Sequence, residues 1–218
     1  NGVYYGIYNL REKQDKEYAE IHDGITPNSL DYIENDGVIK EGDAVAYQQM
    51  VAMLNAGVQG DTAFQALAQV CDIRNYTDYI IAEIFTANTS WGHNIALFRK
   101  RSPEAKWRWF PHDFDRGFNL AEVGGTSMAW ATATNGPDWS NGPFATLFLR
   151  KMLENNTFKE SFVTRFADHL FVTWNPQWIN TRIDRHANWI RNEMPFHVGE
   201  WAGTTSSYGD GIPSVQFW

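Results

Sequence analysis

The fold is decided by residues 107–118, which read Trp107-Arg108-Trp109-Phe110-Pro111-His112-Asp113-Phe114-Asp115-Arg116-Gly117-Phe118. An aromatic strand here leads directly into two aspartates and a turn that ends in glycine. In extended backbone, residues i and i+2 point to the same side, so we expect Asp113 and Asp115 to face one cation. Carboxylate oxygens are the ligands that Mg²⁺ prefers. The alternative is that both aspartates cap the turn or pair with Arg108 or Arg116.

A β-hairpin precedes the two aspartates. Residues 94–100 and 106–111 have strand composition, and the loop between them contains Pro103. Asn94 opens this hairpin and Asp113 follows it, so we expect the two side chains to share a site. An asparagine amide oxygen is a suitable additional metal ligand. The alternative for residues 88–94 is simple helix termination, with Asn and Gly supplying the turn.

The rest of the chain alternates between short strand patterns and longer helical ones. We predict strands at 3–10 and 29–34, and irregular structure at 121–141 and 203–218. Apolar spacing and capping residues predict helices at 14–22, 45–57, 61–70, 72–85, 143–154, 157–172 and 176–193. The sum is an α+β fold in one compact domain over residues 1–218, with a small β portion and a mostly helical body.

Composition narrows the functional classes. The chain has 218 residues, of which 18 are Lys or Arg and 26 are Asp or Glu, so its formal net charge is −8. This argues against a nucleic-acid partner or broad binding to anionic lipid, since both need a basic face. The single cysteine, Cys71, excludes an internal disulfide framework, and we expect it to be a small buried residue. No apolar run approaches the ~18 residues that a membrane span needs, and the oligomeric state stays open.

Three blocks of the sequence, in the right order, resemble the spore coat protein H (CotH) kinase-like family. Residues 2–12, Gly-Val-Tyr-Tyr-Gly-Ile-Tyr-Asn-Leu-Arg-Glu, resemble that family's N-G-x-Y-x-G-x-Y-x-L-x-E segment. Residues 88–94 are similar to its N-x-D…N block, and residues 106–118 to its W-x-W-x-x-x-D-x-D-x-G-F block. The resemblance extends from residue 2 to about residue 120, and the later helices match only in general character.

The resemblance implies an atypical protein-kinase-like fold that binds ATP with Mg²⁺ or Mn²⁺ and phosphorylates protein hydroxyls. It implies that Asp113 holds the metal, with Asp115 as the accompanying acid and Asn94 as a further ligand. It also implies that Glu12 orients a phosphate-binding cation, with Arg11 beside it. The expected partners are then a nucleotide and a protein substrate or a coat or surface protein. The expected location is the spore coat, the cell surface or outside the cell.

The chain departs from the family pattern in three places. Ser90 stands at the position of the expected catalytic aspartate, and a serine is not a comparable base at neutral pH. Residues 32–34 stand where many relatives have a phosphate-binding lysine, for which Lys40 or Arg11 is a possible substitute. The chain begins at Asn1 without a methionine. We therefore expect residues to precede it and part of the N-terminal lobe to be missing.

Other functional classes stay open at this point. Ser90 and the late start favour a degenerate kinase or a non-catalytic surface or coat scaffold or adhesin. Asp113 and Asp115 would also suit a metal-dependent glycosyltransferase, although no alternation of strands and helices surrounds them. His93 and His112 beside Asp113 allow a weak zinc alternative. The ten tryptophans allow a carbohydrate-binding or glycosidase role, although such spacing is more typical of a core.

Overall fold

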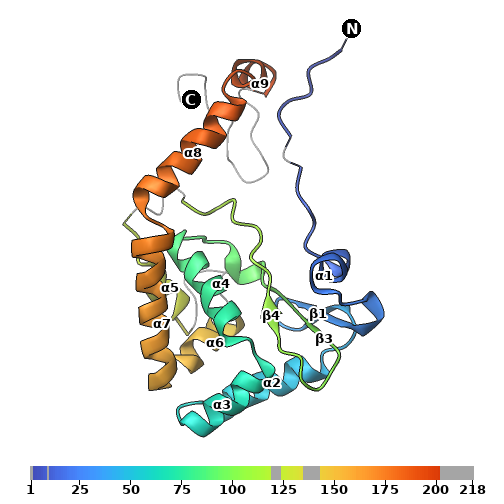
Figure 1. Ribbon diagram of the computed structural model, residues 1–218, viewed down its shortest axis with the longest axis vertical. Coiled ribbons are helices and arrows are strands. Elements are labelled where there is room, and N and C mark those ends of the chain that lie inside the picture. Colours follow the sequence, from blue (N-terminus) through green and yellow to red (C-terminus); the bar gives the residue numbers. More distant parts are fainter. Residues whose placement is uncertain (1, 9, 119–123, 135–142, 202–218) are drawn as a thin grey trace. The chain divides into compact units, whose positions relative to one another are not determined.

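The structure is a computed structural model that describes residues 2–8, 10–118, 124–134 and 143–201. The chain forms two compact units. The larger unit is Lys13–Ala167 and contains the sheet, and the smaller joins Asn1–Glu12 to Asp168–Trp218 (Figure 1). A small antiparallel sheet accompanied by many helices confirms the predicted α+β class.

The sheet has the strand order β2-β1-β3-β4, and every neighbouring pair is antiparallel. Its strands are β1 (Leu30–Glu34), β2 (Val38–Glu41), β3 (Ala96–Lys100) and β4 (Arg108–Trp109). Glu34 pairs with Ala96, and Leu97 pairs with Trp109. The end of β1, the start of β3 and the end of β4 therefore lie at the same end of the sheet. We call this the site end, because Asn94 and Asp113 come from it.

One face of the sheet is covered by helix α1 (Lys16–Asp23). Asp15 caps this helix by accepting hydrogen bonds from the first-turn backbone, as short polar side chains do at N-caps. Tyr32 and Phe98 project from neighbouring strands toward it, and Phe110 stacks on Phe98 with ring centroids 4.2 Å apart. This aromatic cluster ties the strand that precedes Asp113 to the sheet.

The opposite face packs against helix α4 (Ile73–Phe85), which lies beside β4 (Figure 1). The ring of Tyr76 meets the ring of Trp109 at 4.7 Å, and the Asp72 backbone amide donates to the Trp107 carbonyl. The Asp72 side chain caps the helix by accepting a hydrogen bond from the Asn75 amide. Helix α4 is buried on most of its sides, which agrees with its nearly all-round apolar sequence.

The remaining predicted helices are confirmed, with shifted ends. In addition, α5 forms within the stretch predicted to be irregular, and α9 follows α8 as a separate helix. These elements are α2 (Val45–Ala56), α3 (Asp61–Val70), α5 (Ser127–Ala131), α6 (Pro143–Met152), α7 (Asn156–Asp168), α8 (Pro176–Ile190) and α9 (Met194–Trp201). Short 3₁₀ turns lie at Pro27–Ser29 and Trp91–His93, and a π-helical turn at His169–Thr173 follows α7.

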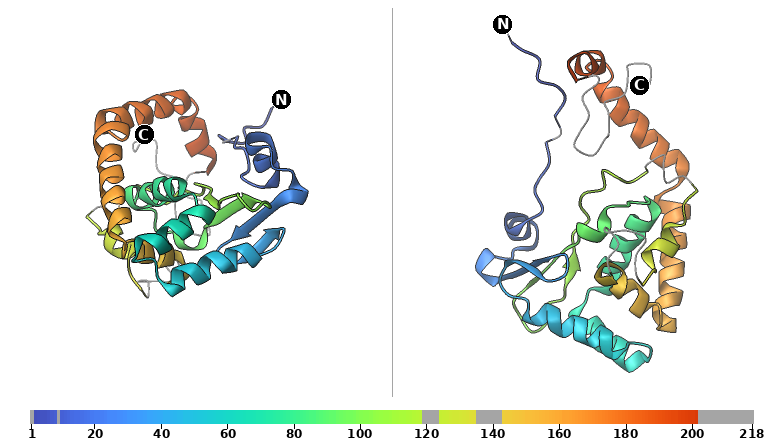
Figure 2. Two further views of the ribbon diagram at one scale, coloured as in Figure 1. Left: turned by 60° about the horizontal axis from the view of Figure 1, so that its bottom comes forward. Right: turned by 180° about the vertical axis from the view of Figure 1, so that it is seen from behind.

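The predicted strand at 3–10 is wrong, because its described residues, 3–8 and 10, form no strand. Figure 2 shows them as an extended chain. In the smaller unit, the Tyr4 hydroxyl donates to the Glu193 carbonyl at 3.4 Å, and the Ile7 amide donates to His197 Nδ1 at 3.1 Å. A strand needs a neighbouring edge as well as suitable side chains. This segment instead contacts helix α9 and the residue before it, through two hydrogen bonds and the Tyr4–Phe196 ring contact.

The burial of Cys71 and of two tryptophans tests two further predictions. Cys71 is buried, as predicted. Trp107 and Trp109 are buried in the core, with exposed fractions of 0% and 3%, so neither ring offers a platform for a sugar.

Across the described parts of the chain, no helix combines the length and the apolar character that a membrane crossing requires.

A buried aspartate fastens the far end of the sheet. Asp31 is 1% exposed and accepts hydrogen bonds from Arg99 Nε at 3.2 Å, Arg101 Nε at 2.7 Å and the Asp43 amide at 3.2 Å. Gly42 lies against this group with φ +75°, and a Cβ there would overlap Asp31 and the Leu30 carbonyl oxygen. A glycine is therefore required both by the backbone angle and by the space.

We predict that Gly42→Ala destabilises the protein by more than about 3 kcal/mol, because backbone strain and overlap add. The control is Gly24→Ala at φ +65°, where nothing lies within 4 Å of the added carbon. That variant carries only the strain of the left-handed conformation, about 1–2 kcal/mol. Urea unfolding measures both, and equal losses would contradict the proposed crowding at Gly42.

Candidate functional site

Asn94 and Asp113 meet at the site end of the sheet. Asn94 follows the 3₁₀ turn before β3, and Asp113 lies in the loop after β4. The Asn94 Nδ2 group donates a short hydrogen bond to Asp113 Oδ2, and solvent reaches both side chains. The two residues are 19 positions apart in sequence, so the antiparallel hairpin is what brings them together. With the Asn94 amide turned over, its oxygen would face the Asp113 carboxylate, and two such oxygens would suit a small hard cation.

Asp115 is exposed, like Asp113. The alternative of a pair with Arg108 is wrong, because Arg108 pairs with Asp23 and lies 3.8 Å from Asp72. The alternatives of a pair with Arg116 and of a turn cap stay open, and solvent reaches both carboxylates. The extended backbone assumed for the two aspartates is absent, because Asp113 is left-handed and Asp115 begins a turn. That Asp115 converges with Asp113 on one cation stays a prediction.

A buried asparagine, Asn88, connects the loop of Asp113 to helix α4. Its Nδ2 group donates to Glu83 Oε2 at 2.8 Å and to the Asp113 backbone carbonyl at 3.2 Å. Its Oδ1 accepts from the Ser90 amide at 3.1 Å and from the Ser90 hydroxyl at 3.0 Å. A side-chain amide has two hydrogens to donate and two lone pairs, so every hydrogen-bonding position of Asn88 is used. This arrangement also fixes the orientation of the amide.

Glu83 is a carboxyl group buried beneath the site, with 1% of its surface exposed. Burial raises its pKa from 4.5 to about 8. The hydrogen bond from Asn88 opposes this rise, the nearby charge of Asp113 adds to it, and the adjacent Tyr79 hydroxyl opposes it. Tyr79 lies close to the carboxyl without forming a hydrogen bond of ordinary geometry. Glu83 therefore carries its proton at neutral pH and acts as a neutral hydrogen-bonding group.

Backbone strain gathers around the same place. Among the described residues, four that are not glycine have positive φ, namely Asn35, Ala87, Asp113 and Phe118. Asp113, at φ +59°, is in the left-handed region that aspartate tolerates better than most residues. Asn35 accepts from the Ile95 amide beside Asn94, and the Phe118 amide donates to the Thr86 carbonyl at 2.6 Å. Strained residues cluster where surrounding structure holds a functional geometry.

The C-terminus of α4 explains the strain at Ala87. The Asn88 amide donates to the Glu83 carbonyl and the Ala87 amide to the Ile84 carbonyl, which is a Schellman motif. Glycine is usual at the left-handed position, and this chain has Ala87 at φ +50°. The motif turns the chain so that the Asn88 side chain points back at Glu83 and at the loop of Asp113.

Ser90 is buried, with 7% of its surface exposed, and its hydroxyl hydrogen is directed at Asn88 Oδ1. It therefore does not occupy an open position in which a base would accept a substrate proton. Arg11 and Glu12 are exposed and belong to the smaller unit, so their role toward Asp113 stays a prediction. Lys40 pairs with Glu34 at 2.9 Å at the end of β1.

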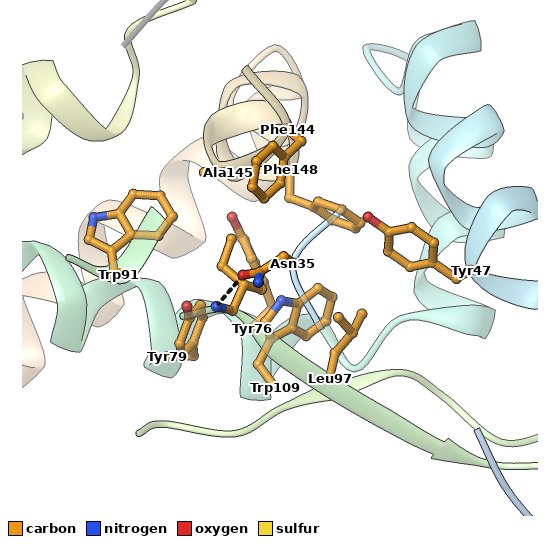
Figure 3. A pocket seen from close by; sticks show the side chains of 11 residues that line it. Asn35, Tyr47, Tyr76, Tyr79, Trp91, Leu97, Trp109, Phe144, Ala145 and Phe148 are labelled. Carbon is orange, nitrogen blue, oxygen red and sulfur yellow. Dashed lines mark hydrogen bonds between the residues drawn. The ribbon is translucent and has the colours of Figure 1, made fainter. Parts of the chain in front are cut away.

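An aromatic pocket lies between the sheet and helices α4 and α6 (Figure 3). Its lining is Asn35, Tyr47, Tyr76, Tyr79, Trp91, Ile95, Leu97, Trp109, Phe144, Ala145 and Phe148. The cavity itself is about 10 Å³, which is room for one water molecule. In this conformation the pocket is part of the core and is too small to hold a purine.

Sequence reasoning missed Glu83 and Asn88 as functional candidates. The signal for Glu83 was present, because it is an acidic residue within an otherwise apolar helix that had to be central. Among the described ranges, no three His, Cys, Asp or Glu side chains lie close enough together to hold a metal ion, so the zinc alternative gains no support. The predicted metal ligands are two carboxylates and one amide, which is a different set.

Fold and site together define an α+β domain whose polar residues meet at one end of a small antiparallel sheet, above a buried carboxyl. The chain belongs to the CotH kinase protein family, whose family model matches residues 1–217. The resemblance inferred from three short blocks therefore extends over essentially the whole chain. No curated protein and no solved structure shows significant similarity to it.

The buried Glu83 predicts how stability depends on pH. The folded protein keeps the Glu83 proton up to about pH 8, whereas the unfolded chain loses it near 4.5. Between these values the folded state binds more protons, so its stability falls as pH rises, by roughly 1.4 kcal/mol for each unit of pKa difference at most. We predict that Glu83→Gln flattens this fall in the free energy of unfolding between pH 5 and 8. A parent-like slope in the variant would contradict the assignment.

Proposed function

We propose that the chain is a kinase domain that binds ATP with Mg²⁺ or Mn²⁺, and whose phosphate transfer to protein hydroxyls is weakened by Ser90. The observation that carries this proposal is the contact between Asn94 and Asp113 at the site end of the sheet. It joins an amide and a carboxylate from two of the family's sequence blocks, and both are accessible. Membership of the CotH kinase protein family supports the reaction class.

In this proposal Asp113 and Asn94 hold the divalent cation, and Asp115 supports them from the same loop. The bound cation neutralises the charge of the ATP phosphates, which is most of what phosphoryl transfer requires of a protein besides positioning. The αL backbone of Asp113 and the Asn88 hydrogen bond keep the carboxylate in place before the cation arrives. Glu12 would orient a phosphate-binding cation, for which Arg11 and Lys40 are the candidates.

Ser90 explains why transfer would be slow. A catalytic aspartate accepts or orients the proton of the substrate hydroxyl. The Ser90 hydroxyl instead donates its own hydrogen to Asn88 and has little exposed surface. The proposal therefore separates nucleotide binding, which the chain retains, from the transfer step, which lacks a base.

We predict that Asp113→Ala lowers the affinity for ATP in the presence of Mg²⁺ at least tenfold, because the cation loses its main charged ligand. The control is Glu104→Ala, which removes an exposed acid from the loop between β3 and β4 at the other end of the sheet. Isothermal titration calorimetry measures both. Unchanged affinity in Asp113→Ala, or an equal loss in the control, would refute the metal assignment.

We predict that Ser90→Asp raises Mg²⁺-dependent transfer of phosphate to a generic protein substrate by at least tenfold over the parent. A positioned base contributes about 10²–10⁴ in rate, and the buried position recovers part of it. Transfer of ³²P from ATP is the measurement, with Ser90→Asn as the uncharged control. A parent that is already fast, or a variant that is no faster, would mean that Ser90 is not what limits transfer.

Ser90 also favours a second candidate, a non-catalytic surface or coat scaffold or adhesin that keeps the fold without the reaction. The two candidates differ in nucleotide binding, because a bound ligand raises the midpoint of thermal unfolding. No thermal shift with ATP and either Mg²⁺ or Mn²⁺ would select the scaffold. The glycosyltransferase alternative gains no support from the sheet, which is antiparallel rather than the parallel type of doubly wound nucleotide-binding folds.

A further inference from the structure

We propose that Asn88 is a positioning residue of the site and that the Ser90 amide fixes its orientation. Asn88 clamps the backbone carbonyl of Asp113 and thereby sets where the Asp113 carboxylate meets a divalent cation. This inference rests on the proposed function for its metal, and on hydrogen bonds of the chain itself for its geometry.

The clamp follows from the hydrogen bonds that Asn88 makes. One Nδ2 hydrogen goes to the Asp113 carbonyl and the other to Glu83 Oε2, while Oδ1 accepts twice from Ser90. If the amide flipped, its NH₂ group would face the Ser90 amide hydrogen. The Asp113 carbonyl would then face an oxygen and lose its donor. The Ser90 amide, which can only donate, and the Asp113 carbonyl, which can only accept, therefore select the orientation in which the Asp113 backbone is held, whereas a neutral carboxyl such as Glu83 can donate or accept.

The hydrogen bond from Asn88 acts at Asp113, whose backbone conformation is unfavourable without tertiary contacts. Asp113 lies in the left-handed region, which an ordinary residue occupies at a cost of about 1–2 kcal/mol. A hydrogen bond to its carbonyl restrains the peptide between Asp113 and Phe114, and so limits rotation about the Asp113 backbone. On the other side, the loop is held by the Phe118 amide on the Thr86 carbonyl. Both anchors belong to the C-terminal end of α4.

The burial of this network fits positioning better than stability. Glu83 and Asn88 are each 1% exposed. Burial at that depth raises the pKa of the Glu83 carboxyl and costs free energy, so the group does not stabilise the fold. An apolar pair of similar size would fill the same space without that cost. Buried polar groups that lower stability and lie near an accessible carboxylate are typical of a site whose ligating side chains must be held in place.

The test compares Asn88→Ala with Asn155→Ala, a matched loss of a buried amide elsewhere in the larger unit. Asn155 is 0% exposed and donates to Gln59 and Asp61 while it accepts from the Phe158 amide. Hydrogen exchange at the Gly117 and Phe118 amides reports the loop without any ligand. Titration with Mn²⁺ alone, followed by electron paramagnetic resonance, reports the site.

We expect Asn88→Ala to speed exchange of the Gly117 and Phe118 amides at least tenfold and to weaken Mn²⁺ binding at least tenfold. Asn155→Ala should leave both at parent values despite a comparable loss of stability. Glu83→Gln keeps an acceptor for Asn88 and should also behave like the parent. If Asn88→Ala does not fold, the double variant Glu83→Leu with Asn88→Ala replaces it, because it also removes the buried Glu83 carboxyl that the single variant leaves without the Asn88 donor.

Parent-like exchange or parent-like Mn²⁺ affinity in the Asn88 variant would overturn the inference. The same holds if Asn155→Ala reproduces its effects, or if Glu83→Gln loses the site. A parent that binds no Mn²⁺ contradicts the proposed function instead, and the exchange rates alone then decide whether the clamp exists.

Discussion

The site depends on one constraint, which is the antiparallel pairing of β3 with β4. This pairing brings the residue that precedes β3 and the residues that follow β4 to the same end of the sheet. The register of Leu97 with Trp109 places Asn94 and Asp113 side by side, and the packing of Phe110 on Phe98 keeps that register in place. A shift by one residue would turn the buried tryptophans outward and separate the two polar residues. The aromatic core and the polar site are therefore consequences of the same pairing.

Helix α4 provides the residues that hold the loop of Asp113 in place. It is buried along most of its length, so its C-terminal end is a fixed point from which the site loop can be held. Glu83, Thr86 and Asn88 are all at that end, and two of them bind the loop through backbone groups. A rigid helix that presents a buried amide to a strained loop positions a ligand more precisely than the loop would alone.

Much of this could be predicted from the sequence, where local signals were strong. The hairpin and α4 were correctly predicted, because alternating aromatics and an N-capping aspartate specify them within a few residues. The strand at 3–10 was wrong because side-chain pattern indicates extended backbone but does not supply a partner edge. The αL conformation of Asp113 and the burial of Glu83 arise from tertiary contacts, which no local pattern reports.

Ser90, which replaces the catalytic aspartate expected from the family pattern, has a structural role in the loop before β3. From the sequence it is a missing base, whereas in the structure its amide and hydroxyl are two of the four groups that fix Asn88. In the proposed function, Ser90 supports the metal site but does not supply the base, so the domain would bind nucleotide more readily than it would transfer phosphate. This reconciles family membership with the altered position.

The most direct test of the central claim is a crystal structure of the chain with Mn²⁺ and a non-hydrolysable ATP analogue, with the manganese located by its anomalous scattering. The account predicts a manganese peak with Asp113 and Asn94 oxygens as ligands, at the ~2.1 Å typical of small octahedral cations. A manganese ion bound elsewhere, or none at all when the two side chains are accessible in the crystal, would contradict it.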